Sequence, residues 1–312
     1  MANLTFVLYR LSRPSLAQQH PIPRDNLANI PKSATSAYPN SLDDDFILSP
    51  SLTLPPAFGS AYVGESFACS LCANNELADD SVKTINGVRI TAEMQTPSQQ
   101  PVSLTLTDTG DGEALAPGAS LQRIVRYDLK EEGVHVLAVN LTYKEISSDG
   151  ATERVRTFRK LYQFQAQLCL SVRTKATELA QREILDKSLG PYNRSFLTRF
   201  VLEAQLENVA EGNIVLEKAE LLAYPPFKAK SMNWDSNPSR DEDDPLLIPR
   251  DVLQLAFIIE QDGNVTDGID ELKTNMKRDG RTNLGQIALA WRSSMGEKGQ
   301  LTTGSLFSRK RA

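Results

Sequence analysis

A repeat of two in the apolar side chains between residues 52 and 75 constrains the fold more than any other feature of this chain. The segment reads LTLPPAFGSAYVGESFACSLCANN, with prolines and glycines ahead of the repeat. The apolar series is Phe67, Cys69, Leu71 and Ala73. The residues between them are Ser66, Ala68, Ser70 and Cys72. Such alternation buries one face of a β-strand, whereas an amphipathic helix repeats about every 3.6 residues. The segment therefore predicts a half-buried strand entered through a turn-rich stretch.

The same repeat recurs along the rest of the chain. Apolar residues occupy alternate positions at residues 88–94, 102–106, 135–143, 196–206, 253–259 and 287–291. Val134, Val136 and Ala138 add apolar groups to the opposite face of one of these segments, which predicts a central strand covered on both sides. Short strands separated by turns are typical of a β-sandwich.

Composition and periodicity together predict an all-β protein with two tandem antiparallel immunoglobulin-like β-sandwich domains. Residues 162–173 alternate without a break, so we expect one strand to close the first sandwich and enter the second near Leu168. The predicted parts are an N-terminal strand at 1–14 that joins the first sandwich, a flexible loop at 15–45, a first sandwich at 46–167, a second sandwich at 168–308 and a basic tail at 309–312.

Two segments of the second domain have helical spacing. Leu179, Ile184, Leu185 and Leu189 precede Gly190 and Pro191, a pair that would end a helix. Ile269, Leu272 and Met276 are spaced for a second short helix. We therefore expect one or two short helices among the strands of this domain.

Composition limits the classes of partner and compartment. The chain has 312 residues, 23% of them charged, and a net charge of -5. An acidic balance argues against nucleic-acid binding, which needs a basic face. Apolar runs stay short of the roughly 20 residues that a membrane helix requires. With 3 cysteines and no framework spacing, the sequence predicts a reducing, cytosolic location.

The motifs that suggest chemistry are weak. Cys69 and Cys72 form a CxxC, but residues three apart on a strand point to opposite faces, so we expect packing cysteines. His135 lacks a marked nucleophile or carboxylate partner, which favours a packed or hydrogen-bonded histidine. The acidic residues at 108–113 lack the spacing of a calcium loop, and the acidic run at 241–244 is interpreted as a solvated loop. We therefore expect no catalytic, cofactor or metal site.

Several strings spread over nearly the whole chain resemble one family. They are YRLSRPSL at 9–16, LTLPPAFGSAYVGESF at 52–67, YDLKEEGVHVLAVNLTY at 127–143, FRKLYQFQ at 158–165, SVRTKAT at 171–177, VLEAQLENV at 201–209, LEKAEL at 216–221 and LGQIALAWRSSMGEKGQLTT at 284–303. In this order they are similar to motifs of the thirteenth-subunit family of the transport protein particle (TRAPP) complex. Members of that family usually continue into a further strand-rich region beyond the last motif, and nothing is carried over from that region.

The resemblance implies a noncatalytic subunit of the TRAPP vesicle-tethering and Rab nucleotide-exchange complex in ER–Golgi and Golgi traffic. It implies other TRAPP subunits as partners, an indirect link to Rab-family GTPases, and a cytoplasmic location at Golgi and ER–Golgi membranes through the complex. The aromatic residues Tyr224, Phe227 and Trp234 are expected to lie exposed in loops as candidate contacts. A stand-alone β-sandwich adaptor for cargo or lipid, and an enzyme with an unrecognised site, are the alternatives.

Overall fold

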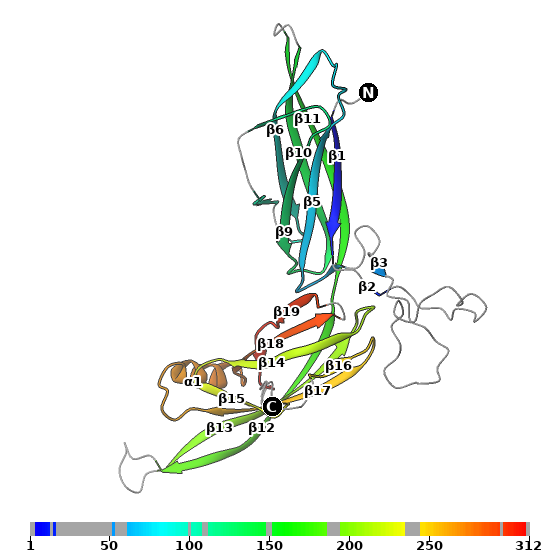
Figure 1. Ribbon diagram of the computed structural model, residues 1–312. Coiled ribbons are helices and arrows are strands. Elements are labelled where there is room, and N and C mark those ends of the chain that lie inside the picture. The colour runs from blue at the N-terminus through cyan, green and yellow to red at the C-terminus, as the bar shows by residue number, and fades with distance from the viewer. Residues whose placement is uncertain are drawn as a thin grey trace, which may run out of the picture.

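The computed structural model describes residues 4–12, 15–16, 52–53, 61–98, 101–107, 112–147, 152–185, 194–234, 244–293 and 296–309. These ranges are mostly β-strand, arranged in several sheets whose pairs are nearly all antiparallel. Figure 1 shows the sheets gathered in two lobes along the chain. We call the sheets formed by residues 4–12 and 61–167 the N-terminal sheets, and those formed by residues 170–307 the C-terminal sheets.

The N-terminal sheets comprise a small and a large sheet. The small sheet has the order β1 (Leu4–Leu11), β5 (Ser66–Asn75), β9 (Ser120–Asp128). The large sheet has the order β4 (Ala61–Tyr62), β11 (Glu153–Gln167), β10 (Gly133–Ser147), β6 (Lys83–Gln95), β7 (Val102–Leu104), and β8 (Glu113–Leu115) also pairs with β6. The apolar alternation around residues 67–73 forms β5, as the sequence predicts.

The C-terminal sheets also comprise two. One has the order β12 (Leu170–Leu185), β13 (Arg194–Asn208), β17 (Val252–Gln261), β15 (Phe227–Ser231). The other has the order β16 (Leu246–Leu247), β14 (Ile214–Ala223), β18 (Asn283–Ser293), β19 (Lys298–Thr302), with β20 (Leu306–Phe307) paired to β18. A separate pair joins β2 (Ser15–Leu16) to β3 (Leu52–Thr53).

Each set of sheets encloses its own cluster of buried apolar residues. The first cluster takes its members from residues 4–166 and the second from residues 169–291. Every second residue of β13 from Phe200 to Leu206 is at most 1% exposed, and β17 contributes Leu255, Phe257 and Ile259 at 0%. These are the residues that the alternation assigns to a core face. Burial on one face of each strand is what joins the facing sheets.

The predicted helix at residues 179–189 is wrong over residues 179–185, and residues 186–189 lie outside the described residues. In the described residues this part of the chain continues β12, whose partners in β13 include Phe200 for Glu178 and Ser195 for Ile184. A register shift between Leu179 and Arg182 interrupts the pairing there. The three- and four-residue spacing of apolar groups was ambiguous, and long-range pairing with β13 overrides local helical preference.

The second predicted helix is confirmed as α1 (Ile269–Arg278). Leu272 is its buried residue, and Met276 packs against the second core. Asp270 and Glu271 lie in the first turn and Lys277 and Arg278 in the last, an order that suits the helix dipole. The described part of the chain holds no helix with the length and hydrophobicity that crossing a bilayer requires.

Two finer expectations differ from the structure. The continuous strand at residues 162–173 is instead divided, because β11 ends at Gln167 and β12 starts at Leu170. Leu168 between them is 36% exposed, whereas Cys169 is buried. β10 is central in its sheet, but its second face is only partly covered, since Val134 is 45% exposed while Ala138 is buried.

We expect the core face of β13 to be essential for folding of the C-terminal sheets. Phe200→Ala should lower the free energy of unfolding by about 3–5 kcal/mol, because Phe200 is 1% exposed and packs edge-on against Phe227. Phe196→Ala on the same strand is the control, since Phe196 is 59% exposed. Its effect should stay within about 0.5 kcal/mol in chemical denaturation. Equal losses for both variants would contradict this assignment of the core.

Candidate interaction site at the joint between the sheets

Backbone hydrogen bonds join the two sets of sheets around Gly64. The Gln300 N–H of β19 donates to the Gly64 carbonyl at 3.0 Å, and Glu65 forms an antiparallel bridge with Gly299. On the other side, the Gly64 N–H donates to the Leu129 carbonyl at 2.7 Å. The short segment before β5 thus pairs with β19, which is an edge strand of its own sheet. We call this contact, formed by Gly64, Glu65, Trp291, Gly299 and Gln300, the joint.

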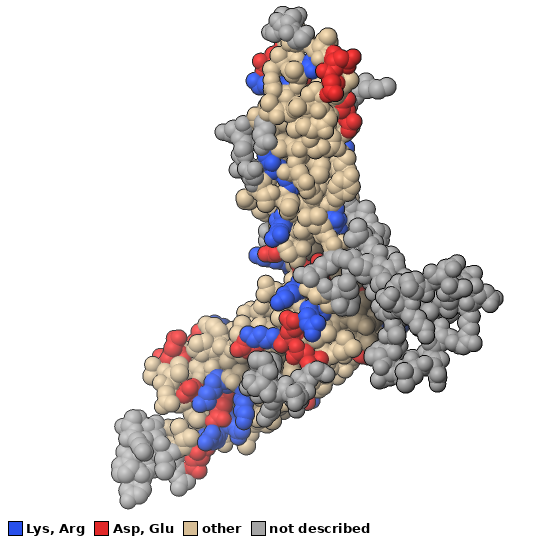
Figure 2. All heavy atoms as spheres, in the orientation of Figure 1, with Lys and Arg blue, Asp and Glu red and all other residues tan. Residues whose placement is uncertain are grey.

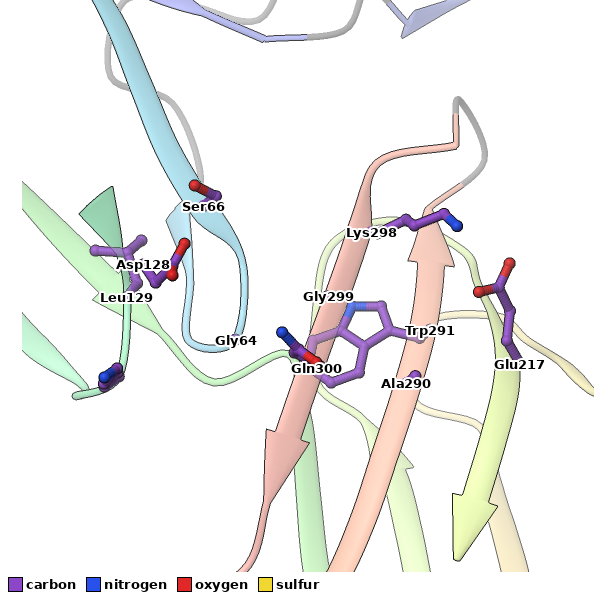
Figure 3. A pocket seen from close by; sticks show the side chains of 11 residues that line it. Gly64, Ser66, Asp128, Leu129, Glu217, Ala290, Trp291, Lys298, Gly299 and Gln300 are labelled. Atoms are coloured by element: carbon purple, nitrogen blue, oxygen red, sulfur yellow. The ribbon is translucent and has the colours of Figure 1, made fainter. Parts of the chain in front are cut away.

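Two glycines of the joint make room for one tryptophan. Trp291 of β18 is 1% exposed, and its ring lies between the β18–β19 hairpin and the turn that carries Gly64 (Figure 3). A Cβ atom on Gly299 would overlap the indole ring, and one on Gly64 would lie 2.7 Å from the indole Cη2. Gly64 also has φ = 96°, a conformation that L side chains rarely adopt. Both positions therefore require glycine.

Apolar and polar side chains add to the joint. Leu301 of β19 packs against both hydrophobic cores, and Tyr62 of β4 packs against the second core. The Tyr62 hydroxyl accepts a hydrogen bond from the Glu211 backbone N–H at 3.1 Å. The indole N–H of Trp291 has no acceptor among the described residues. These contacts make the joint a packed interface with one unsatisfied donor.

Hollows flank the start of β19 on both sides of the joint. One cavity of about 440 Å³ is lined by residues that include Asp128, Lys130, Glu217 and Lys298, several of which Figure 3 labels. A second of about 470 Å³ is lined by Leu11, Ser12, Ser66, Ala68, Arg126, Gly296, Glu297 and Lys298. Ser66 and Lys298 line both cavities, so the two are neighbours on the surface, and we treat them together. We call the pair the joint groove.

Three charged residues from separate elements meet beside the joint: Arg10 of β1, Glu65, and Glu297 ahead of β19. Burial raises the pKa of Glu65 to about 7, and the carboxylate of Glu297 adds to the rise while Arg10 and the Tyr62 backbone oppose it. Burial also lowers the pKa of Arg10, against the attraction of Glu297 and Glu65. Glu65 therefore changes its charge near neutral pH at the contact between the sheets.

His135 occupies the interior, as the sequence predicts. It is 0% exposed, and its Nδ1 lies 3.1 Å from the Gly133 carbonyl oxygen. Its ring stacks on Phe164 at 5.5 Å between centroids, and Phe164 stacks on Phe67 at 4.5 Å. The Arg10 guanidinium lies over the Phe67 ring at 5.7 Å. This stack ties the histidine to the core next to the joint.

The cysteines behave as packing residues. Cys69 and Cys169 are buried, whereas Cys72 is half-buried on the other face of β5 from Cys69. Burial raises the pKa of both Cys69 and Cys169 to about 12, which keeps these thiols protonated and weakly nucleophilic. The CxxC therefore does not present two thiols to one ion, as strand geometry predicts. Residues 108–111 and 241–243 and His20 lie outside the described residues.

The three predicted contact aromatics have different surroundings. Tyr224 is 40% exposed, and its hydroxyl donates to Glu271 at 3.3 Å. Trp234 is half-buried and packs against the second core. Phe227 is 7% exposed as the first residue of β15, so its expected loop exposure is wrong. Its apolar ring is buried by pairing of β15 with β17 and by contact with Phe200.

The joint itself was not predicted from the sequence. Its residues do lie in two of the strings that carry the family resemblance, GESF at 64–67 and WRSSMGEKGQL at 291–301. β18 and β19 pair as an antiparallel hairpin on either side of Gly296. No sequence signal links the two strings, because the glycines in both are equally typical of local turns.

We expect the glycine at position 299 to be required sterically. Gly299→Ala should lower the free energy of unfolding by about 1–3 kcal/mol, because the added methyl group displaces β19 or the Trp291 ring. Gly304→Ala is the matched control, since a Cβ atom there meets nothing within 4 Å. Chemical denaturation should show a change within about 0.5 kcal/mol for the control. A Gly299→Ala protein as stable as the control would refute the packing argument.

We expect Glu65 to make stability depend on pH around neutrality. Its pKa of about 7 in the folded protein exceeds its ordinary value of 4.5, so the folded protein gains stability as pH falls from above 7 toward 4.5. Glu65→Gln should therefore raise the free energy of unfolding at pH 8 by up to about 3 kcal/mol, since each unit of pKa shift corresponds to about 1.4 kcal/mol. The variant should lose this advantage by pH 5.

The control for this measurement is Glu203→Gln on β13, a 44%-exposed carboxylate beside Lys175. Its effect should remain below about 1 kcal/mol at pH 8. Denaturation curves at pH 5 and pH 8 check both variants. A Glu65→Gln protein that is equally destabilised at the two pH values would show that Glu65 acts through a specific ionised contact instead.

Comparison with known proteins gives two adjacent family matches. The model for "Trafficking protein particle complex subunit 13, N-terminal" matches residues 3–166, and that for "Trafficking protein particle complex subunit 13, middle domain" matches residues 170–311. Among solved structures, a class 5 fimbriae chaperone, CfaA, aligns with 77% of this chain and 92% of its own, at 9% identity and a TM-score of 0.20. That similarity is too low to support an argument.

Curated relatives agree with the family matches. A probable trafficking protein particle complex subunit 13 homolog of Drosophila melanogaster is 27% identical, over 95% of this chain and 62% of its own length. The Caenorhabditis elegans homolog is 26% identical and the Danio rerio protein 24%, each over 97% of this chain and 68% of its own length. The chain thus spans roughly two thirds of these relatives. It belongs to the trafficking protein particle complex subunit 13 family.

Proposed function

We propose that this chain is a noncatalytic subunit of the TRAPP complex and contributes docking surfaces to vesicle tethering and Rab nucleotide exchange in ER–Golgi and Golgi traffic. The observation that carries the proposal is the pair of family matches at residues 3–166 and 170–311, which together span nearly the whole chain. In this proposal the protein works in the cytoplasm and reaches Golgi membranes through the complex.

The arrangement of sheets supports a role in docking. We propose two immunoglobulin-like sandwiches divided near Leu168, each with its own core, as the two hydrophobic clusters suggest. Sheet edges offer unpaired backbone groups to a partner strand. β12 and β1 are such edges in the described sheets. The joint then sets the two sandwiches relative to each other and so shapes any surface that spans them.

The surroundings of the reactive groups support a noncatalytic role. His135 is sealed inside the first core against Phe164, and the thiols of Cys69 and Cys169 are buried with raised pKa values. A general base or a nucleophile must reach its substrate, which these groups do not. They serve packing of the sandwiches in this proposal.

Co-purification tests the proposal. We expect the tagged chain at native expression to bring down other TRAPP subunits, measured by quantitative mass spectrometry against an untagged strain. Gly299→Ala should recover less of each subunit, since it perturbs the joint, and Gly304→Ala should recover as much as the wild-type chain. Recovery of no TRAPP subunit by the wild-type chain would contradict the proposal and favour a stand-alone cargo or lipid adaptor.

A further inference from the structure

The outer face of the small N-terminal sheet is a surface with almost no charge. Its cross-strand rows, read from the register of β1, β5 and β9, are Thr5–Asn74–Ser120, Val7–Cys72–Gln122, Tyr9–Ser70–Ile124 and Leu11–Ala68–Arg126. Arg126 is the charged member of these rows, and Asp128 follows it on the same face opposite Ser66, both at the end nearest the joint. Figure 2 shows a broad area without either sign of charge on the upper lobe, where Figure 1 places β1 and β5. In a chain with 23% charged residues this face stands out.

Polar groups on this face are largely bonded to one another. The Gln122 amide donates to the Ser70 hydroxyl at 2.8 Å, and the Ser120 hydroxyl donates to the Asn74 side-chain oxygen at 2.8 Å. The apolar side chains are left to water, since Tyr9 is 59% exposed and Leu11 40%. Larger apolar residues on β1, which we call the apolar rim, lie beside small residues on the central strand. A surface of this kind favours an apolar, uncharged partner.

Charge appears where the face meets the joint groove. Arg126, Lys130 and Lys298 line the groove, and none of them forms an ion pair with another described residue. Of the carboxylates there, Glu217 pairs with Arg292 at 3.0 Å. Glu297 attracts the Arg10 guanidinium, and this attraction raises the pKa of Arg10 against the lowering effect of burial.

Asp128 also lines the groove and, like the three cations, has no ion pair within the described residues. It offsets one of the three positive charges of Arg126, Lys130 and Lys298. The unpaired surplus of the groove is therefore positive, which attracts a negatively charged group.

The size of the face requires that a partner extend into the groove. Strands about 4.8 Å apart and a rise of about 3.4 Å per residue give the face a projected area of roughly 340 Å². A stable protein interface buries about 800 Å² on each partner. The face is therefore too small alone, and it continues past Leu11 and Ala68 into the groove, which enlarges the surface that a partner can cover.

We propose that the outer face of β1–β5–β9 and the joint groove together form the docking surface for another subunit of the complex. The partner segment is apolar and uncharged where it crosses Tyr9 and Val7, and it carries acidic side chains where it reaches Arg126, Lys130 and Lys298. Because it contacts both sets of sheets, its binding adds a further contact across the joint. This inference rests on the proposed function and names the surface through which that function is exercised.

The test measures binding of the purified chain to TRAPP complex assembled without it, by biolayer interferometry. Tyr9→Lys should weaken binding by at least tenfold because it places a charge on the apolar rim. The double variant Arg126→Glu and Lys298→Glu should weaken it by at least tenfold, and the wild-type affinity should fall as salt is raised. The control is Leu161→Lys on the large sheet, where Leu161 is 62% exposed, and it should stay within twofold of wild type.

The outcomes separate this inference from the proposed function. Wild-type binding that both surface variants retain in full would overturn the docking surface and leave the proposed function standing. Failure of the wild-type chain to bind would overturn the proposed function and the docking surface with it. Binding of the chain to vesicles with anionic headgroups, lost in the double variant while complex binding persists, would assign the groove to a membrane and overturn the inference. Thermal denaturation of each variant checks the fold, and we expect these exposed substitutions to leave it intact.

Discussion

Packing of one buried indole against two glycines is the constraint on which the arrangement of this molecule depends. Trp291 belongs to the second core, yet its ring reaches the turn at Gly64 in the N-terminal sheets. A side chain at Gly64 or Gly299 would occupy the same space as the ring. The tight contact lets the Gln300 N–H reach the Gly64 carbonyl at 3.0 Å. Shape and backbone hydrogen bonding thus reinforce each other across the joint.

Burial at this contact changes the pKa of Glu65. A carboxylate next to packed apolar groups loses hydration, and Glu65 accordingly has its pKa raised to about 7, with Glu297 adding to the rise. Arg10, which lies on β1, opposes part of this rise in the pKa of Glu65. The contact between the sheets is therefore most stable when Glu65 is protonated. A partner that contributes acidic groups to the same groove would act on this balance, because it adds negative charge beside Glu65 and Glu297.

Much of the strand content could be predicted, and the joint could not. Alternation identified the core faces of β13 and β17, because a repeat of two directly reports which side chains share a face. The apolar spacing at 179–189 fitted a helix, but pairing with β13 made residues 179–185 strand, since local spacing carries no information on long-range partners. Phe227 was expected in a loop for the same reason, because β17 supplies its pairing partner. Gly64 and Gly299 are far apart in sequence, so no local pattern joins them. The family strings marked both places without showing that they touch.

The central claim is that the glycine-packed joint holds the two sets of sheets in one arrangement. Distances between spin labels on the two sets of sheets test this claim most directly. Labels at Leu161→Cys and Phe196→Cys, in a Cys72→Ser background, report across the joint from two exposed positions. Double electron–electron resonance should give a single narrow distance distribution that Gly64→Ala broadens and Gly304→Ala leaves unchanged. A wild-type distribution as broad as that of Gly64→Ala would contradict the account.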